Sequence, residues 1–180
     1  MDDLFLKMIP VILNNECGKG NGYVNDKDDN GGETIFGICK KFYPKLKIWE
    51  SLEKLTYVKD KKSYQPTEEE MDEIFNIYYV NYYKPCKTNL FNDPELGLQV
   101  FDMAVNAGVK TSIKLLQKLL RIPQDGICGR QTINTANVKH GVLEGFKMAR
   151  TDYYVDISKR GNNKKFLQGW INRVANTKLS

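Results

Sequence analysis

The sequence predicts a mainly α protein of the α+β kind, a bundle of helices with a small β-hairpin and loop region near the N-terminus. Three observations predict it. Apolar residues recur with the helical period of 3.6 along most of the chain, several segments begin with helix-capping residues, and one early segment is rich in Gly, Asn and Asp. The 180 residues suit one domain, or one domain with a small appended lobe.

Residues 3–15 are expected to form the first helix, since their apolar side chains recur at helical spacing. Pro10 either kinks this helix or starts its second part. Residues 16–37 then read ECGKGNGYVNDKDDNGGETIFG, which predicts loops and short hairpin strands, with strand pieces at 23–24 and 34–36. A segment this long and irregular is more often functional than a mere connection.

Capping residues and apolar periodicity predict the later helices. They are expected from the capping box of Thr67 to Glu70 up to the residue before Pro85, from Asp93-Pro94 to near Gly108, from Thr111 or Ser112 onward, and around 131–138, 142–158 and 164–175.

The net charge of +5 hides an asymmetry along the chain. Residues 1–102 contain 13 Lys and Arg against 18 Asp and Glu, whereas the remainder contains 14 against 4. A basic half suits an anionic polymer: nucleic acid, anionic lipid or an acidic cell-wall polymer. Because no five basic residues run together, we expect a general preference for polyanions and no specific recognition of nucleic acid.

The cysteines and the histidine predict neither a metal site nor a cofactor. Cys17, Cys39, Cys86 and Cys128 form no C-x-x-C pair, and His140 is the one histidine. We interpret His140 as a surface or capping residue, and the count of cysteines leaves their disulfide state open.

The sequence also carries expectations about compartment and assembly. No apolar run approaches the roughly 20 residues of a membrane span, so no stable membrane insertion is expected. The first residues open acidic and lack the pattern of a Sec signal peptide. We therefore expect a monomer made in the cytoplasm, which reaches the periplasm or cell wall by holin-type or specialised release.

Glu16 lies where the first helical pattern ends and the Gly-rich segment begins. A carboxylic acid held against an apolar wall keeps its proton more readily, and a second carboxylate facing it across a loop would suit hydrolysis of a glycosidic bond. Asp26, Asp28 and Asp29, followed by Thr34, supply candidates for the second group. Carboxylates are common in loops, so spacing alone indicates this chemistry weakly.

A calcium-binding EF-hand loop is a rival interpretation of the same residues. Asp26 to Gly31 fits the first half of that loop, D-x-D-x-N-G. However, the twelfth position should be a glutamate and is Gly37, and a Gly-rich segment stands where a helix should enter. We do not expect an EF-hand.

Four segments in order resemble the motifs of glycoside hydrolase family 108. The family's signature reads E-G-G-Y-x-N-D and then D-x-G-G-x-T-x-x-G-I, and three further motifs follow it. The matching segments are GYVND at 22–26 with DNGGETIFGI at 29–38, FDMAVNAG at 101–108, LLQKLLRIPQDGICGRQT at 115–132 and FLQGWINRV at 166–174.

The resemblance implies a lysozyme-like fold whose hairpin lies beside an active-site cleft. Residues 1–108 would be the catalytic region and residues 109–180 a helical peptidoglycan-binding-like lobe, packed together as one compact unit. The implied activity is that of an N-acetylmuramidase, which cleaves the β-1,4 bond between N-acetylmuramic acid and N-acetylglucosamine in bacterial peptidoglycan.

The resemblance also implies roles for individual residues. Glu16 matches the family's proton donor, and Asp29 and Thr34 match the positions that help to place the attacking water. The chain departs from the family in one respect, because four extra residues separate Glu16 from Tyr23. A Gly-rich bulge could absorb them. The choice of Asp29 over Asp26 or Asp28 stays open, as does inversion or retention at the anomeric carbon.

Further residues are candidates for binding the sugar chain: Tyr23, Asp26, Asp102, Asn106 and Trp170. Asp102 and Asn106 are spaced i, i+4 and share a helix face, where they could line a sugar cleft or satisfy hydrogen bonds in the core. Trp170 could stack on a sugar ring or belong to the core.

Two other functions stay possible: a non-catalytic cell-wall-binding module and, less expected, a nucleic-acid-binding protein. Whether a muramidase of this kind is a bacteriolytic phage or prophage endolysin, a secretion accessory or an exported effector is open.

Overall fold

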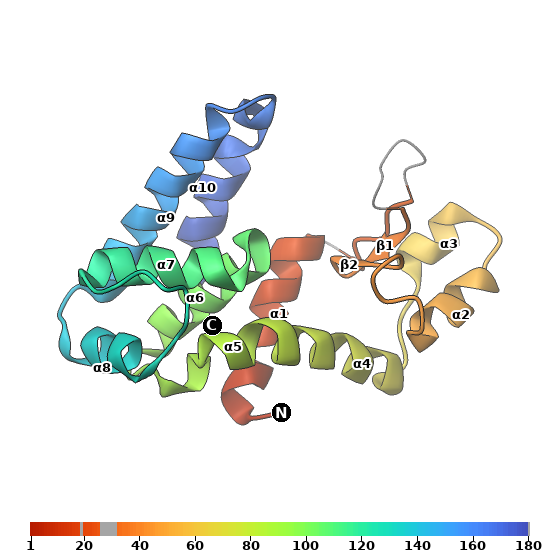
Figure 1. The fold of residues 1–180 in the computed structure, drawn as a ribbon. Coiled ribbons are helices and arrows are strands. Elements are labelled where there is room, and N and C mark those ends of the chain that lie inside the picture. The colour runs from red at the N-terminus through yellow and green to blue at the C-terminus, as the bar shows by residue number, and fades with distance from the viewer. Residues whose placement is uncertain (19, 26–31, 180) are drawn as a thin grey trace. The chain divides into compact units, whose positions relative to one another are not determined.

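The computed structural model describes residues 1–18, 20–25 and 32–179. It is mainly α, as predicted, and its described residues include one two-stranded sheet (Figure 1). The chain forms two compact units: unit 1 comprises Met1–Val11 and Tyr78–Ser180, and unit 2 comprises Ile12–Ile77. The division into a catalytic region 1–108 and a lobe 109–180 stays a prediction.

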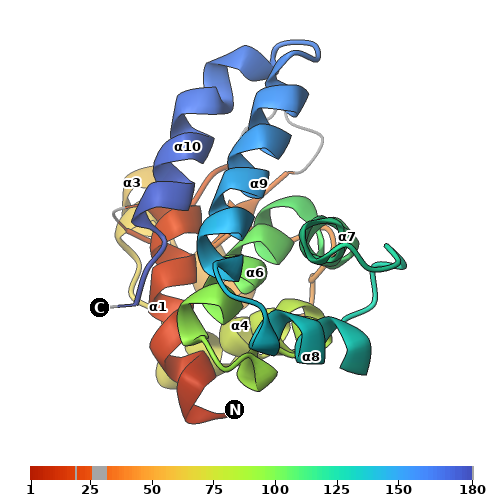
Figure 2. The same cartoon turned by 90° about the vertical axis from the view of Figure 1, so that its left-hand side faces the viewer.

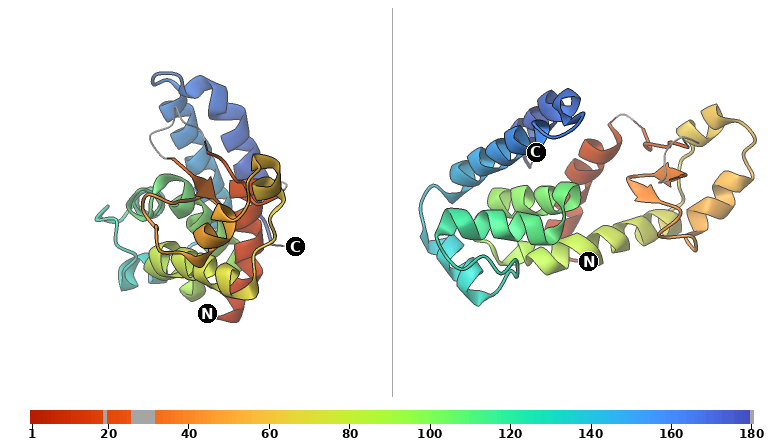
Figure 3. Two further views of the ribbon diagram at one scale, coloured as in Figure 1. Left: turned by 90° about the vertical axis from the view of Figure 1, so that its right-hand side faces the viewer. Right: turned by 45° about the horizontal axis from the view of Figure 1, so that its top comes forward.

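Unit 2 contains the hairpin and the helices around it (Figures 1 and 3). Its elements are the end of α1 (Asp3–Cys17), β1 (Thr34–Ile35), β2 (Ile38–Cys39), α2 (Lys47–Glu53), α3 (Val58–Ser63) and most of α4 (Glu68–Tyr78). The strands pair antiparallel, with Thr34 opposite Cys39. Local patterns missed β2, α2 and α3, because these elements are two to seven residues long and α3 buries none of its residues.

The capping box at the start of α4 is confirmed. The N–H of Thr67 donates to Glu70 Oε2 (2.8 Å), and the N–H of Glu70 donates to Thr67 Oγ1 (3.3 Å). The predicted end before Pro85 is wrong, because the helical path continues to Cys86. A π-helix intervenes, and Pro85 then lies in the first turn of the next helix, where its missing N–H is not needed.

Unit 1 is a helical assembly built on one central helix. Its elements are the first part of α1, the π-helix Tyr79–Tyr83, α5 (Lys84–Cys86), a 3₁₀ turn at Thr88–Leu90, α6 (Pro94–Ala107), α7 (Val109–Leu120), α8 (Arg130–Val138), α9 (Val142–Ser158), a 3₁₀ turn at Asn163–Phe166 and α10 (Leu167–Asn176). Helices α9 and α10 lie side by side (Figures 1 and 2).

Helix α6 begins as predicted and is buried on all sides. Asp93 Oδ1 accepts the N–H groups of Glu95 (2.9 Å) and Leu96 (3.4 Å), with Pro94 in the first turn. Nine consecutive residues, 96–104, are buried, which indicates a helix enclosed by its neighbours.

The predicted start of α7 at Thr111 or Ser112 is wrong. Gly108, with φ of +90°, turns the chain directly from α6 into α7, which begins at Val109. Ser112 is fully buried instead, and its hydroxyl donates to the carbonyl of Val100 (2.8 Å). Among the helices of the described residues, none is long and apolar enough to cross a bilayer.

Candidate active site

Glu16 lies in the last turn of α1, on the face that the helix buries. Ile12, one turn earlier on that face, is fully buried. The Glu16 carboxyl is partly buried, and its Oε1 atom has almost no exposed surface. Glu16 therefore lies at a helix end with one carboxyl oxygen buried, and its role as the acid stays a prediction.

The chain folds back on the end of α1 directly after Glu16. Gly18, Gly20 and Gly22 have φ of +59°, +113° and +64°, backbone angles that glycine adopts most readily. A Cβ atom at Gly22 would lie only 3.2 Å from atoms of Cys17. Gly22 thus lies against Cys17 at the end of α1, as a Gly-rich bulge would require. Burial, with the nearby Glu16 charge, raises the pKa of the Cys17 thiol to about 11, so Cys17 is a poor nucleophile.

Tyr23 anchors the segment that follows. The ring is buried, with 3% of its surface exposed, and its hydroxyl donates to Glu33 Oε1 (2.7 Å). Asn21 accepts the Tyr23 N–H (3.0 Å) and donates to the carbonyls of Lys61 (2.7 Å) and Tyr64 (3.2 Å). These bonds connect the residues after the bulge to α3. Because Tyr23 is buried, it is better suited to supporting the hairpin than to contacting a sugar.

Thr34, a predicted catalytic residue, lies at the base of the hairpin in β1. Its backbone N–H and C=O pair with those of Val24 (2.8 and 2.9 Å), and its hydroxyl contacts the carbonyl of Gly32 (3.5 Å). The predicted partners Asp26, Asp28 and Asp29 lie outside the described residues, as does the candidate EF-hand loop. Their roles stay predictions.

The hairpin turn is built by two residues in the left-handed region. Phe36 (φ +50°) and Gly37 (φ +72°) connect β1 to β2, as a two-residue turn with positive φ at both positions requires. The Phe36 N–H donates to the carbonyl of Asn21 (2.8 Å), and its side chain is buried. The hairpin is therefore held at its turn as well as at its base.

An ion-pair network that the sequence analysis missed supports the hairpin at Glu33. Its carboxylate accepts Tyr23 Oη, Lys40 Nζ (3.0 Å) and Lys61 Nζ (3.4 Å). Burial opposes ionisation of Glu33, but the hydrogen bonds from Tyr23 and Lys40 and the nearby lysine charges outweigh it and lower the pKa of the carboxyl. Glu33 stands directly before Thr34 in the signature, yet no local pattern identifies lysines 7 and 28 residues away as its partners.

Asp102 is a core residue in unit 1. Its side chain is fully buried and accepts hydrogen bonds from Arg150 Nη2 (2.5 Å) on α9 and from Arg173 Nη2 (2.8 Å) and Nε (3.0 Å) on α10. Of the two interpretations of Asp102, this geometry favours the core hydrogen-bonding one. The FDMAVNAG and FLQGWINRV segments thus meet through an ion pair.

Asn106 and Trp170 both contact Tyr154. Asn106 is exposed, and its Oδ1 accepts the hydroxyl of Tyr154 (2.8 Å). The Trp170 ring stacks on Tyr154 at 5.3 Å between centroids and is partly buried against the core of unit 1. Asn106 therefore remains accessible to a ligand, whereas Trp170 packs as a core aromatic does.

Unit 1 also has a hollow of about 430 Å³ between α7 and α9. Apolar side chains line it together with cations from the end of α7 and carboxylates from α9. The lining residues are Leu115, Lys118, Leu119, Arg121, Ala149, Asp152, Tyr153 and Asp156. Within the described part of the chain, no group of three or more His, Cys, Asp or Glu side chains could hold a metal ion.

A partly buried glutamate stands in the last turn of a helix, a hairpin held by hydrogen bonds follows it, and the scaffold is mainly α. This arrangement fits a lysozyme-like glycoside hydrolase, and two family models support action on peptidoglycan. The chain belongs to glycosyl hydrolase family 108, whose model matches residues 9–108. A second model, described as a predicted peptidoglycan domain, matches residues 111–175.

A solved structure supports the fold. The chain is similar to Brucella abortus SagA, with 23% sequence identity over 96% of this chain and 90% of that chain and a TM-score of 0.67. At this identity the likeness shows the fold alone. Among curated protein sequences, no match was found.

Proposed function

We propose that the protein is an N-acetylmuramidase of the lysozyme type, cleaving the β-1,4 bond between N-acetylmuramic acid and N-acetylglucosamine. The observation that carries this proposal is the position of Glu16. It precedes the Gly-Tyr of the signature, four residues further away than in the family, lies inside the matched range 9–108, and has its Oε1 atom buried in the last turn of α1. Such a setting suits a carboxylic acid that must deliver a proton.

In the proposed reaction Glu16 donates its proton to the glycosidic oxygen as the bond to the anomeric carbon breaks. A water attacks that carbon, and Asp29 orients the water and accepts its proton. Thr34 assists in holding the water, and its backbone pairing with Val24 gives it a fixed position at the hairpin base. We expect inversion, by analogy with phage lysozymes, which requires carboxyl groups far enough apart to admit the water.

The test compares Glu16→Gln with Glu50→Gln, the same change at an exposed position in the first turn of α2. Loss of a general acid costs about 10²- to 10⁴-fold in rate. We expect Glu16→Gln to release almost no reducing ends from purified peptidoglycan, while Glu50→Gln stays near wild type. Mass spectrometry of the muropeptides identifies which sugar forms the new reducing end. Full activity of a folded Glu16→Gln variant would exclude Glu16 as the acid.

The second carboxylate is tested by single substitutions to Asn at Asp26, Asp28 and Asp29. We expect Asp29→Asn to lose the most activity. A larger loss at either neighbour would move the role to that residue, and the proposal for Glu16 would stand unchanged.

A non-catalytic wall-binding module is the alternative, favoured by the basic charge of the second half and by the match to a peptidoglycan domain. It predicts salt-sensitive binding to insoluble peptidoglycan without any new reducing ends.

For the biological setting we propose a bacteriolytic role as a phage or prophage endolysin, acting in the periplasm or cell wall after holin-type release. Expression in a bacterial host with and without a holin tests this. Lysis that requires both the holin and Glu16 supports the proposal, and lysis without the holin contradicts the release route.

A further inference from the structure

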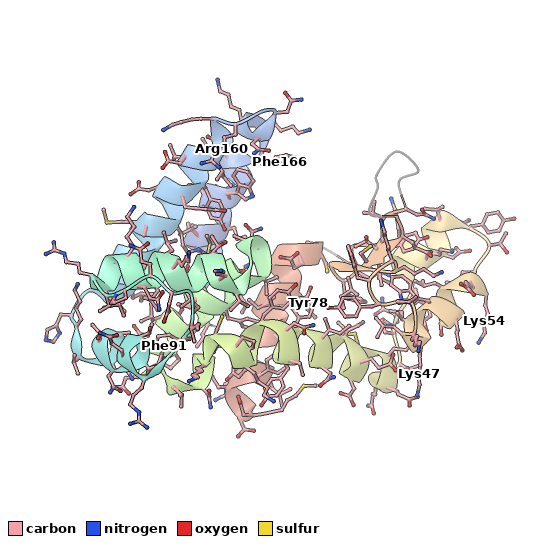
Figure 4. The ribbon with its side chains drawn as sticks, viewed as in Figure 1. Lys47, Lys54, Tyr78, Phe91, Arg160 and Phe166 are labelled. Carbon is pink, nitrogen blue, oxygen red and sulfur yellow. The ribbon has the colours of Figure 1, made fainter. Side chains whose placement is uncertain are left out.

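The connection between α9 and α10 is a concentrated basic surface. We define the α9–α10 tip as residues 159–166, KRGNNKKF, which contain four cations and no acidic residue. The tip lies at the end of the paired helices α9 and α10, where Figure 4 labels Arg160 and Phe166. All of its residues except Asn163 are exposed, so its charges face solvent.

One carboxylate near the tip offsets part of this charge. Asp156 Oδ1 accepts Lys159 Nζ at 2.9 Å, and the charges of Arg160 and Lys118 also act on Asp156. Helix α10 contains no acidic residue. Arg160, Lys164 and Lys165 therefore give the tip a local excess of about three positive charges.

An exposed aromatic side chain stands among these cations. Phe166 leaves 48% of its surface in solvent, and Lys165 Nζ lies 4.9 Å from the ring centroid. The ring also contacts Trp170, at 5.8 Å between centroids, which helps to hold it in place on the tip. Charge and an exposed apolar ring thus occur together on a single connection.

We propose that the α9–α10 tip docks reversibly on the surface of an anionic phospholipid bilayer. The lysine and arginine side chains meet the headgroup phosphates, and Phe166 enters the interfacial layer. Basic residues near such a surface are attracted to it, and an aromatic ring is stabilised at the interface between the apolar lipid layer and water. A hydrated anionic wall polymer would satisfy the charges equally well but offers the ring no apolar layer, so the exposed ring favours lipid.

Docking of this kind is peripheral. It does not depend on the proposed muramidase reaction, because none of the tip residues takes part in it.

The test uses the full chain and co-sedimentation with vesicles of phosphatidylcholine alone or mixed with phosphatidylglycerol. We expect binding to the anionic vesicles, weakened by salt. Replacing Arg160, Lys164 and Lys165 together by Gln should weaken it on the order of 100-fold, since each cation near an anionic surface contributes about a fivefold gain. A matched control replaces three scattered exposed lysines, Lys7, Lys45 and Lys54, and should retain most of the binding.

Phe166→Ser tests the aromatic contribution and should weaken binding roughly 3- to 10-fold, because about half of the ring is available for burial. Phe166→Trp should preserve it. Circular dichroism and hydrolysis of solubilised peptidoglycan confirm that each variant is folded. The proposal is overturned if wild type does not bind anionic vesicles, if the triple variant binds like its control, or if Phe166→Ser changes nothing. Tip-dependent binding to purified wall polymer, without binding to vesicles, overturns it as well.

Discussion

The buried ion pair at Asp102 allows a sharp test of what holds unit 1 together. One carboxylate balances two guanidinium groups, and the exposed fractions are 0% for the side chains of Asp102 and Arg150 and 10% for Arg173. Asp102→Asn keeps the size of the side chain but removes the charge and turns an acceptor into a donor. The contacts of α6 with α9 and α10 made through it then lose the negative charge that faces Arg150 and Arg173.

The expected cost follows from the burial. Removing one partner of a buried pair costs about 3–5 kcal/mol, because the remaining charge stays in the core without compensation. Arg150 keeps its bonds to the backbone and side-chain oxygens of Gln99, which are uncharged. We expect about 3 kcal/mol or more for Asp102→Asn. The total stability of a protein is about 5–15 kcal/mol, so this is a large share of it.

The matched control is Asp156→Asn, the same chemical change in an exposed pair with Lys159. An exposed pair contributes about 0–1 kcal/mol. Urea and thermal unfolding, followed by circular dichroism, should place the melting temperature of Asp102→Asn roughly 6–12 °C or more below that of wild type, and that of Asp156→Asn within about 4 °C. If the two variants unfold alike, the ion pair does not stabilise the helices and the reasoning is refuted.

Two further predictions concern the hairpin and the helices. Glu33→Gln should lower stability at neutral pH and flatten its dependence on pH. Because the folded state lowers the pKa of Glu33, its stabilising effect is present above the unfolded-state pKa of about 4.3 and is lost as the pH falls through the folded-state value. Thermal melts between about pH 3 and pH 7 test this, and an equal loss for variant and wild type in acid would contradict it. Gly97→Ala should destabilise α6, because its Cβ would lie 2.9 Å from the backbone oxygen of Thr88. Gly169→Ala meets no atom within 4 Å and should stabilise α10 by up to about 1 kcal/mol, so equal effects in denaturant titrations would refute the contrast.

Local signals predicted most of the helices correctly. The capping box at Thr67, the Asp93-Pro94 start and the Gly108 end depend on residues a few positions apart, so they can be recognised in the sequence. The same applies to the early Gly-rich segment, whose glycines adopt the positive φ angles that their number suggested. Where prediction failed, as at Ser112, a residue suited to capping was used for a buried hydrogen bond to another helix.

Part of the candidate site could likewise be predicted from local patterns, and part depends on the folded structure. The order of glutamate, hairpin and threonine could be predicted, because each belongs to a continuous motif. The supports of the site could not, since Glu33 finds Lys40 and Lys61 only once the hairpin folds. Tyr23, a candidate for sugar binding, is buried because the folded hairpin brings its hydroxyl to Glu33.

The sequence by itself determined the mainly α class, the positions of the capped helices, the family and the place of the acidic residue at the end of the first helix. Only the tertiary structure decided which polar residues face solvent and which balance one another in the core. Asp102 could have lined a sugar cleft or paired internally, and its partners Arg150 and Arg173 lie 48 and 71 residues away. Contacts over such separations depend on how the helices pack, and local propensity carries no information about that packing.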